Sequence, residues 1–155
     1  MIPSLIEINQ VEKGYVGEEG RPVLGLSFDL LMARWAAGER DKETALRLLF
    51  LGWYAHCEPP FLTGLHEVAQ TICAEAFAAL GDVHTSDPEV CFVVSVMADA
   101  YPWAFGDESR WTQIGQALSV RVAELQPNGV PLNVFSGRGA YGAYFTRAVA
   151  VRTGR

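Results

Sequence analysis

The sequence predicts an all-α fold, a compact bundle of six to seven helices that forms a single domain over residues 1–155. Apolar residues recur at intervals of three and four along most of the chain, and glycine, proline or a capping residue separates one such run from the next. Half of the residues are hydrophobic and 19% are charged, a composition typical of a packed core and not of a disordered chain.

Two segments are apolar enough to be the innermost helices, and the first covers about residues 42–57. In its ALRLLFLGWYAHC stretch only Arg47, Gly52 and His56 are not hydrophobic, which is the composition of a helix enclosed on all sides. The segment is too short to cross a bilayer, which takes about 20 apolar residues. We expect Asp41 to open this helix and the following Glu-Pro-Pro to end it.

The second innermost helix covers about residues 88–101. Asp87 offers a capping oxygen, and Pro88 suits the first position of a helix. The β-branched residues that follow would also suit a buried strand, but the start signal and the length favour a helix. Ser95 and Asp99, four residues apart, would lie on the same face of this helix.

The N-terminal arm, residues 1–25, is the part that the pattern defines least. The sequence Leu-Ile-Glu-Ile would serve equally well in a short strand. A helix over residues 2–16 is preferred, because its apolar residues have near-helical spacing. These residues are Leu5, Ile8, Val11 and Tyr15.

Four further helices are expected, each beginning at a capping or turn residue. They run from Ser27 to Ala37, from Thr63 to Leu80, from Asp107 or Ser109 to Leu125, and from near Ser136 onward, with 126–136 as the loop before the last helix. The last helix is expected to bury Tyr141, Tyr144, Phe145, Ala148 and Val151.

The charge distribution bounds the kind of partner. A net charge of −6 argues against a nucleic-acid-binding protein, because neutralising phosphates requires a basic face. The chain from Arg121 onward carries five arginines and one acid, whereas residues 1–120 carry seven bases and seventeen acids. The basic C-terminal helix therefore either docks on an acidic body or forms a site for an anion or an acidic partner.

The three cysteines and the N-terminus indicate a cytoplasmic protein. The cysteines, at positions 57, 73 and 91, lie in apolar runs without CxxC spacing, a pattern typical of free thiols in a reducing compartment. The N-terminus has neither the basic stretch nor the long apolar run of a secretory signal. We expect no membrane association.

A glycine motif at residues 137–142, GRGAYG, matches the GxGxxG pattern of dinucleotide-binding folds. Only thirteen residues follow it, which leaves no room for a second strand or for the acid that holds the ribose. We therefore expect no cofactor. A glycine-rich helix start with Arg138 could still hold a phosphate or a carboxylate. The alternative is that small residues let the last helix pack closely.

A small enzyme or ligand-binding protein is the alternative function, with a pocket lined by Arg47, His56, Cys57, His66 and Asp99. A cysteine nucleophile needs a base within hydrogen-bond reach, which His66 could supply only if the turn after Cys57 folds two helices together. Asp99 would need a partner if buried, and Arg47 is the natural one. The ligand-type residues show no recognised zinc spacing, so we expect no metal site.

Aromatic residues gather around the predicted helix ends, where they would serve as core or as interface anchors. The candidate binding residues are Trp53, Tyr54, His56, Tyr101, Trp103, Phe105 and Trp111. Since no catalytic constellation has the spacing its chemistry requires, we expect a non-catalytic protein that binds a peptide or protein segment in an aromatic, partly acidic groove. An apolar face left over would also favour a homodimer or a place in a larger assembly.

Overall fold

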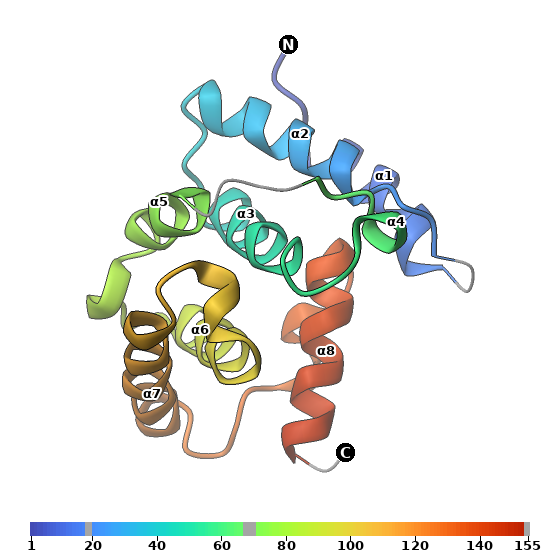
Figure 1. Cartoon of the computed structure of the whole chain (residues 1–155). Coiled ribbons are helices and arrows are strands. Elements are labelled where there is room, and N and C mark those ends of the chain that lie inside the picture. The colour runs from blue at the N-terminus through green and yellow to red at the C-terminus, as the bar shows by residue number, and fades with distance from the viewer. Residues whose placement is uncertain (18–19, 67–70, 154–155) are drawn as a thin grey trace.

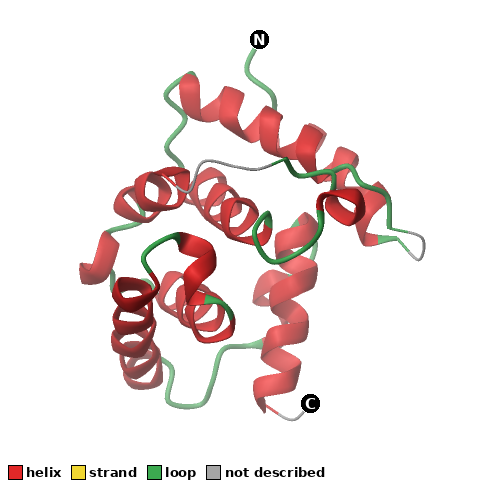
Figure 2. Cartoon of the chain, in the orientation of Figure 1, coloured by secondary structure: helices red, strands yellow, loops and turns green. Residues whose placement is uncertain are grey.

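All regular secondary structure in the part of the chain that the computed structural model describes, residues 1–17, 20–66 and 71–153, is helical (Figure 2). The all-α prediction is confirmed. The α-helices are α1 (Leu5–Val16), α2 (Leu24–Ala36), α3 (Lys42–Tyr54), α4 (Pro60–Thr63), α5 (Thr71–Ala79), α6 (Pro88–Ala100), α7 (Glu108–Leu125) and α8 (Gly139–Thr153). Short 3-10 turns are η1 (Asp82–His84), η2 (Pro102–Phe105) and η3 (Leu132–Phe135). The described residues thus hold one α-helix more than the upper limit predicted, because α4 forms in the proline-rich segment.

The two helices predicted to be innermost are α3 and α6, and both are enclosed. Every residue from 44 to 53 in α3 and from 90 to 98 in α6 is buried. Figure 1 shows α3 at the centre of the molecule, with α2, α5, α6 and α8 around it. The apolar composition of these two segments is therefore explained by burial on all sides.

Local signals set most of the helix starts. The side chains of Asp41, Asp87 and Asp107 each accept a hydrogen bond from a backbone amide in the first turn of the following helix. Asp107 and not Ser109 therefore starts α7. At the other end of α3 the helix stops at Tyr54, before residue 57, and the next residues form turns.

The N-terminal arm forms α1, the preferred helix, through a capping box. The Ser4 hydroxyl accepts the Glu7 amide at 3.1 Å, and the Glu7 carboxylate accepts the Ser4 amide at 2.7 Å. These reciprocal bonds are available only at a helix start, so they select a helix over the strand that the Leu-Ile-Glu-Ile stretch would otherwise allow.

The prediction that Ser27 caps α2 is wrong. The helix begins at Leu24, one turn earlier, and its N-cap residue makes no side-chain hydrogen bond. Ser27 is fully buried inside α2, where its hydroxyl donates to the carboxylate of Glu12 in α1. The Ser27 hydroxyl therefore donates its hydrogen bond to a buried carboxylate of another helix. It does not accept a hydrogen bond from the unpaired amides at the start of its own helix.

The prediction of one helix from Thr63 to Leu80 is also wrong. Thr63 is the last residue of α4, and Gly64 follows with a φ of +78°, a conformation that favours glycine. A Cβ at Gly64 would collide with the Pro22 carbonyl, so the close approach of these two segments turns the chain away from a helical path. The next described helix begins at Thr71, and residues 67–70 of the predicted helix lie outside the described residues.

The last helix begins later than predicted, at Gly139 instead of near Ser136. Part of the loop predicted over 126–136 forms the 3-10 turn η3. Its buried face includes Tyr141 and Phe145, as expected, but Val151 is 82% exposed. The final turn of α8 therefore faces solvent, and the predicted apolar stripe ends before it.

Candidate functional site

A groove of about 950 Å³ lies between α1, the C-terminal half of α3, η3 and α8. The N-terminal end of α8 packs beside α1 (Figure 1), and the groove follows this junction. Its described lining contains five aromatic residues, three cations and several glycines, and one apolar residue of α4. The aromatic residues are Tyr15, Phe50, Tyr54, Phe135 and Tyr144.

The aromatic wall of the groove is built on Phe50 of α3. The Phe50 ring stacks on that of Tyr54, with centroids 5.1 Å apart, and lies 5.4 Å from that of Tyr144. The hydroxyl groups of Tyr15 and Tyr54 lie 2.7 Å apart in a hydrogen bond. Burial, and then the hydrogen bond to Tyr15, raise the pKa of Tyr54. At neutral pH the Tyr54 phenol is therefore a neutral hydrogen-bonding group.

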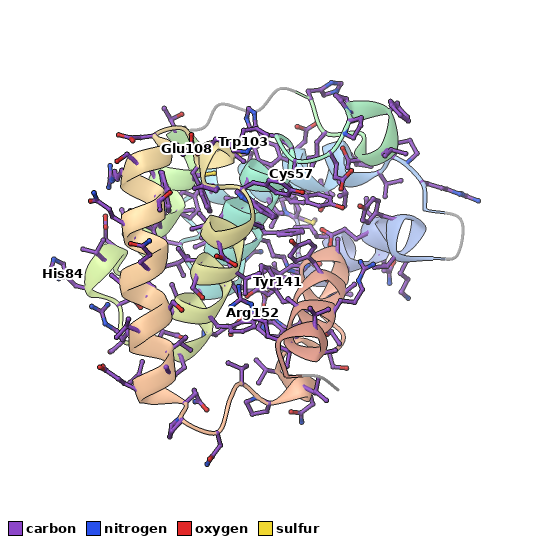
Figure 3. All side chains as sticks on the ribbon, turned by 60° about the horizontal axis from the view of Figure 1, so that its bottom comes forward. Cys57, His84, Trp103, Glu108, Tyr141 and Arg152 are labelled. Carbon is purple, nitrogen blue, oxygen red and sulfur yellow. The ribbon has the colours of Figure 1, made fainter. Side chains whose placement is uncertain are left out.

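The aromatic wall continues beyond the groove to two exposed rings. The Trp53 ring lies 5.8 Å from Tyr144 and 6.2 Å from Tyr101, and its indole N–H donates to the Tyr101 carbonyl at 3.0 Å. Tyr101 and Trp103 are each 46% exposed, and their rings meet edge to face at 5.9 Å. Figure 3 shows Trp103 at the edge of the molecule. The aromatic contacts therefore run from the groove to the surface.

The other predicted aromatic residues belong to the core. Trp53, Phe105 and Trp111 are at most 3% exposed, and the rings of Phe105 and Trp111 stack at 4.0 Å. They cannot contact a partner in the folded protein, so their part in a binding site is limited to supporting the exposed rings. His56 and Tyr54 are half-buried.

The cations of the groove are Lys13, Arg138 and Arg147, and its described lining contains no acid. Residues 18 and 19, both glutamate, lie outside the described residues. Among the described residues the lining of the groove is therefore basic. Lys13 and Arg147 are exposed and form no ion pair within the described part of the chain. Burial raises the pKa of Tyr144, and the nearby charge of Arg147 acts against this shift.

Arg138, predicted as an anion contact, is already neutralised by the protein. Its guanidinium lies 3.0 Å from a Glu43 oxygen and 2.7 Å from a Glu89 oxygen, and it stands 5.0 Å from the ring of Tyr141. Burial disfavours the charged guanidinium, but the two carboxylates outweigh this effect and raise the pKa of Arg138. The residue therefore joins α3, α6 and α8 and is not available to an external anion.

Arginines of the basic C-terminal part bind groups in the acidic part before it. This is the first of the two interpretations given for the uneven charge of the chain. Besides Arg138, Arg152 pairs with Asp99 at 3.4 Å. Arg121 donates to the carbonyls of Val83 and Thr85 at 2.6 and 2.8 Å. These contacts use the charge for packing between helices.

The glycine-rich start of α8 binds an anion, but that anion is a side chain of the same protein. The Ala140 amide donates to the carboxylate of Glu12 at 2.8 Å, in the position where an external phosphate would bind a helix N-terminus. Gly139 has a φ of +66°, and a Cβ there would collide with the Glu12 carboxylate. A Cβ at Gly142 would collide with the Phe135 carbonyl. The motif therefore serves close packing, the alternative weighed for it.

The glycine motif yields a graded prediction. We expect Gly139→Ala and Gly142→Ala each to lower the free energy of unfolding by about 3 kcal/mol, because their Cβ atoms meet groups that cannot move apart. Gly137→Ala should cost only about 1 kcal/mol, the strain of a left-handed residue, since nothing lies within 4 Å of its Cβ position. Urea denaturation measures all three. Three equal losses would contradict the packing role.

The five residues of the alternative pocket do not come together. Arg47 is 2% exposed and pairs with Glu43 in its own helix, at 3.2 Å. Its predicted partner Asp99 has a side chain that is 81% exposed and lines a separate cavity of about 420 Å³ between α6 and α7. His66 is exposed beyond α4.

The predicted pairing of Arg47 with Asp99 is therefore wrong. Besides Glu43, the Arg47 guanidinium donates to the Asn9 side chain at 2.5 Å. Asn9 of α1 thus binds the Arg47 guanidinium, for which the Asp99 carboxylate had been predicted. Residue pairs this far apart in sequence are set by the packing of helices, which periodicity alone does not reveal.

Cys57 lacks the surroundings of a catalytic nucleophile. Its thiol donates to the Trp53 carbonyl at 3.3 Å, and burial, with a smaller effect of Glu58, raises the pKa of Cys57 to about 12. His84, on η1, lies at the left edge of the molecule in Figure 3, away from Cys57. Within the described ranges no three metal-ligating side chains cluster as a metal site would require.

We therefore expect Cys57 to react slowly with iodoacetamide. Relative to an ordinary thiol of pKa 9.0, a pKa of about 12 lowers the thiolate fraction about a thousandfold. The greater nucleophilicity of the more basic thiolate recovers part of this loss, leaving a rate about fiftyfold lower. Mass spectrometry of alkylated protein at pH 7.5 measures this rate, with the urea-unfolded chain as reference. Alkylation as fast as in the unfolded chain would revive the enzyme hypothesis.

Comparisons with protein-family models, with curated proteins and with solved structures found no significant match to this chain. Among the described residues no helix combines the length and the apolar character needed to span a bilayer. The function therefore has to be argued from the groove itself. Of the residues that line the groove, the sequence singled out only Tyr54 and Arg138 for binding. The cations Lys13 and Arg147 and the other aromatic residues were missed, because they become neighbours only when α1 and α8 pack on α3. These aromatic residues are Tyr15, Phe50, Phe135 and Tyr144.

Proposed function

We propose that this protein is a non-catalytic binding module that holds an extended peptide segment of a partner protein in the groove between α1, α3 and α8. The observation that carries the proposal is an open groove of about 950 Å³ along the junction of α1 and α8, with the half-buried rings of Tyr54 and Tyr144 in its wall. Ligand sites span roughly 300–1,000 Å³, and an open groove between two helices suits a chain better than a compact molecule.

The chemistry of the wall suits a peptide. The half-buried rings of Tyr54 and Tyr144, which pack on the fully buried Phe50, offer apolar faces to a partner side chain, and aromatic residues are enriched among the anchors of protein interfaces. The phenol hydroxyl groups of Tyr15 and Tyr54 are placed to exchange hydrogen bonds with the amides of an extended backbone. Polar groups that fix orientation beside an apolar wall are the usual arrangement of such sites.

The titratable groups beside the groove favour binding over acid–base catalysis. A general acid or base works best with a pKa near the operating pH. Instead, burial raises the pKa of Tyr54 and of Tyr144 above the ordinary value for tyrosine. Arg138 is held by Glu43 and Glu89. The two tyrosine hydroxyl groups are suited to donate and accept hydrogen bonds without exchanging protons. Arg138 can only donate hydrogen bonds.

A substitution that fills the groove tests this proposal. Ala143 lines the groove on α8, so Ala143→Trp should occupy the space of a bound segment. The probes are three fluorescein-labelled peptides of about nine residues, each with the same two phenylalanines and with glutamate, glutamine or lysine at the remaining positions. We expect fluorescence anisotropy to show saturable binding of at least one peptide, weakened at least about tenfold by Ala143→Trp, which is 1.4 kcal/mol of binding free energy.

The matched control is Ala123→Trp, at an exposed position of α7, which should leave binding unchanged. Far-UV circular dichroism and urea denaturation verify that both variants fold. The proposal fails if none of the three peptides binds the wild-type protein at about 100 μM. It fails also if a folded Ala143→Trp variant binds as the wild type does.

A further inference from the structure

We propose that the segment bound in this groove is acidic, and that Lys13 and Arg147 bind its carboxylates while an apolar side chain packs on the rings of Tyr54 and Tyr144. This inference rests on the proposed function and specifies its ligand. The two cations come from different helices, Lys13 from α1 and Arg147 from α8, and both line the groove. A segment lying along the groove would therefore meet positive charge from both helices.

The position of these two cations supports this assignment. Five other cations are paired with carboxylates of the protein itself. Arg34, Lys42, Arg47, Arg138 and Arg152 each form at least one ion pair with a carboxylate. Lys13 and Arg147 have no such partner within the described ranges, although the chain as a whole carries a net charge of −6. Arg21, Arg40, Arg110 and Arg121 form no ion pair among the described residues either, but none of them lines the groove. Two such cations facing one groove favour an anionic ligand there.

A ligand can bind Arg147 without breaking a strong contact of that side chain. Its Nε–H donates to the Ala143 carbonyl of its own helix over 3.4 Å, a long contact that a carboxylate can replace. Arg147 is also close enough to Tyr54 and Tyr144 for its charge to act against the raised pKa of both, whereas the charge of Glu58 acts in the opposite direction. A carboxylate bound beside these rings would be partly shielded from water, where a charge-assisted hydrogen bond is stronger than on an open surface.

The overall charge favours an acidic peptide over a nucleic acid or an anionic membrane. A polyanion meets the whole face of a protein, and its binding depends on many neutralised phosphates. This chain carries 12 bases against 18 acids, so such a surface would be repelled outside the groove. A short segment with a few carboxylates experiences chiefly the local field of Lys13 and Arg147, because salt screens more distant charges within about 10 Å.

Charge reversal of the two groove cations tests the inference. We expect the glutamate peptide to bind the wild-type protein at least about tenfold more tightly than the lysine peptide at low salt, with a smaller difference at higher salt. The double variant Lys13→Glu/Arg147→Glu should reverse this order. The single variant Arg147→Gln should weaken the glutamate peptide and leave the glutamine peptide unaffected.

The control must change the net charge equally and leave the groove intact. Arg110→Glu/Arg152→Glu does so, because Arg110 and Arg152 are exposed residues of α7 and of the end of α8 that do not line the groove. It should retain the preference for the glutamate peptide. If it abolishes the preference as fully as Lys13→Glu/Arg147→Glu does, overall charge is responsible and the inference is overturned.

The two proposals fail in different ways. If the glutamate and glutamine peptides bind equally, and Ala143→Trp still weakens both, the groove binds peptides without reading charge, so only the inference fails. If no peptide binds, the proposed function fails. Tighter binding of a single-stranded oligonucleotide or of phosphatidylserine vesicles than of the glutamate peptide, sensitive to Lys13→Glu/Arg147→Glu, would overturn the inference in favour of a polyanion.

Discussion

The arrangement of α1, α2 and α8 depends on one buried carboxylate, that of Glu12. Its residue is 1% exposed, and its two oxygens accept hydrogen bonds from the Ser27 hydroxyl and from the Ala140 amide. A carboxylate taken out of water costs several kcal/mol unless it is hydrogen-bonded. The positive end of the α8 dipole adds to its stabilisation. Three helices distant in sequence must therefore meet at this point.

The candidate site follows from that meeting point. With Glu12 at the start of α8, the next residue of α1, Lys13, lines the same groove as Arg147, two turns further along α8. Arg138, the residue before α8, joins this helix to α3 and α6 through ion pairs with Glu43 and Glu89. Two buried electrostatic contacts thus hold the walls in place. The binding residues themselves remain on the surface, where a partner can reach them.

Local signals in the sequence were enough to predict the fold class, the two enclosed helices and the aspartate caps, because periodicity and capping act within a few residues. The glycine motif indicated an anion at the start of the last helix, but not that Glu12 supplies it. Ser27 was assigned to a cap for the same reason, since its partner lies in another helix. Of the residues that line the groove, only Tyr54 and Arg138 were predicted. The groove cations depend on helix pairing, which no local pattern encodes.

The most direct test of this account is the hydrogen exchange of the Ala140 amide, measured by NMR in the native protein. Amides in the first turn of a helix have no acceptor within it and usually exchange fast. Because Glu12 accepts this one in the core, we predict protection similar to that of the enclosed α3 amides, at least about a hundredfold above a first-turn amide open to solvent. Exchange of the Ala140 amide as fast as that of Gly137 would contradict the account.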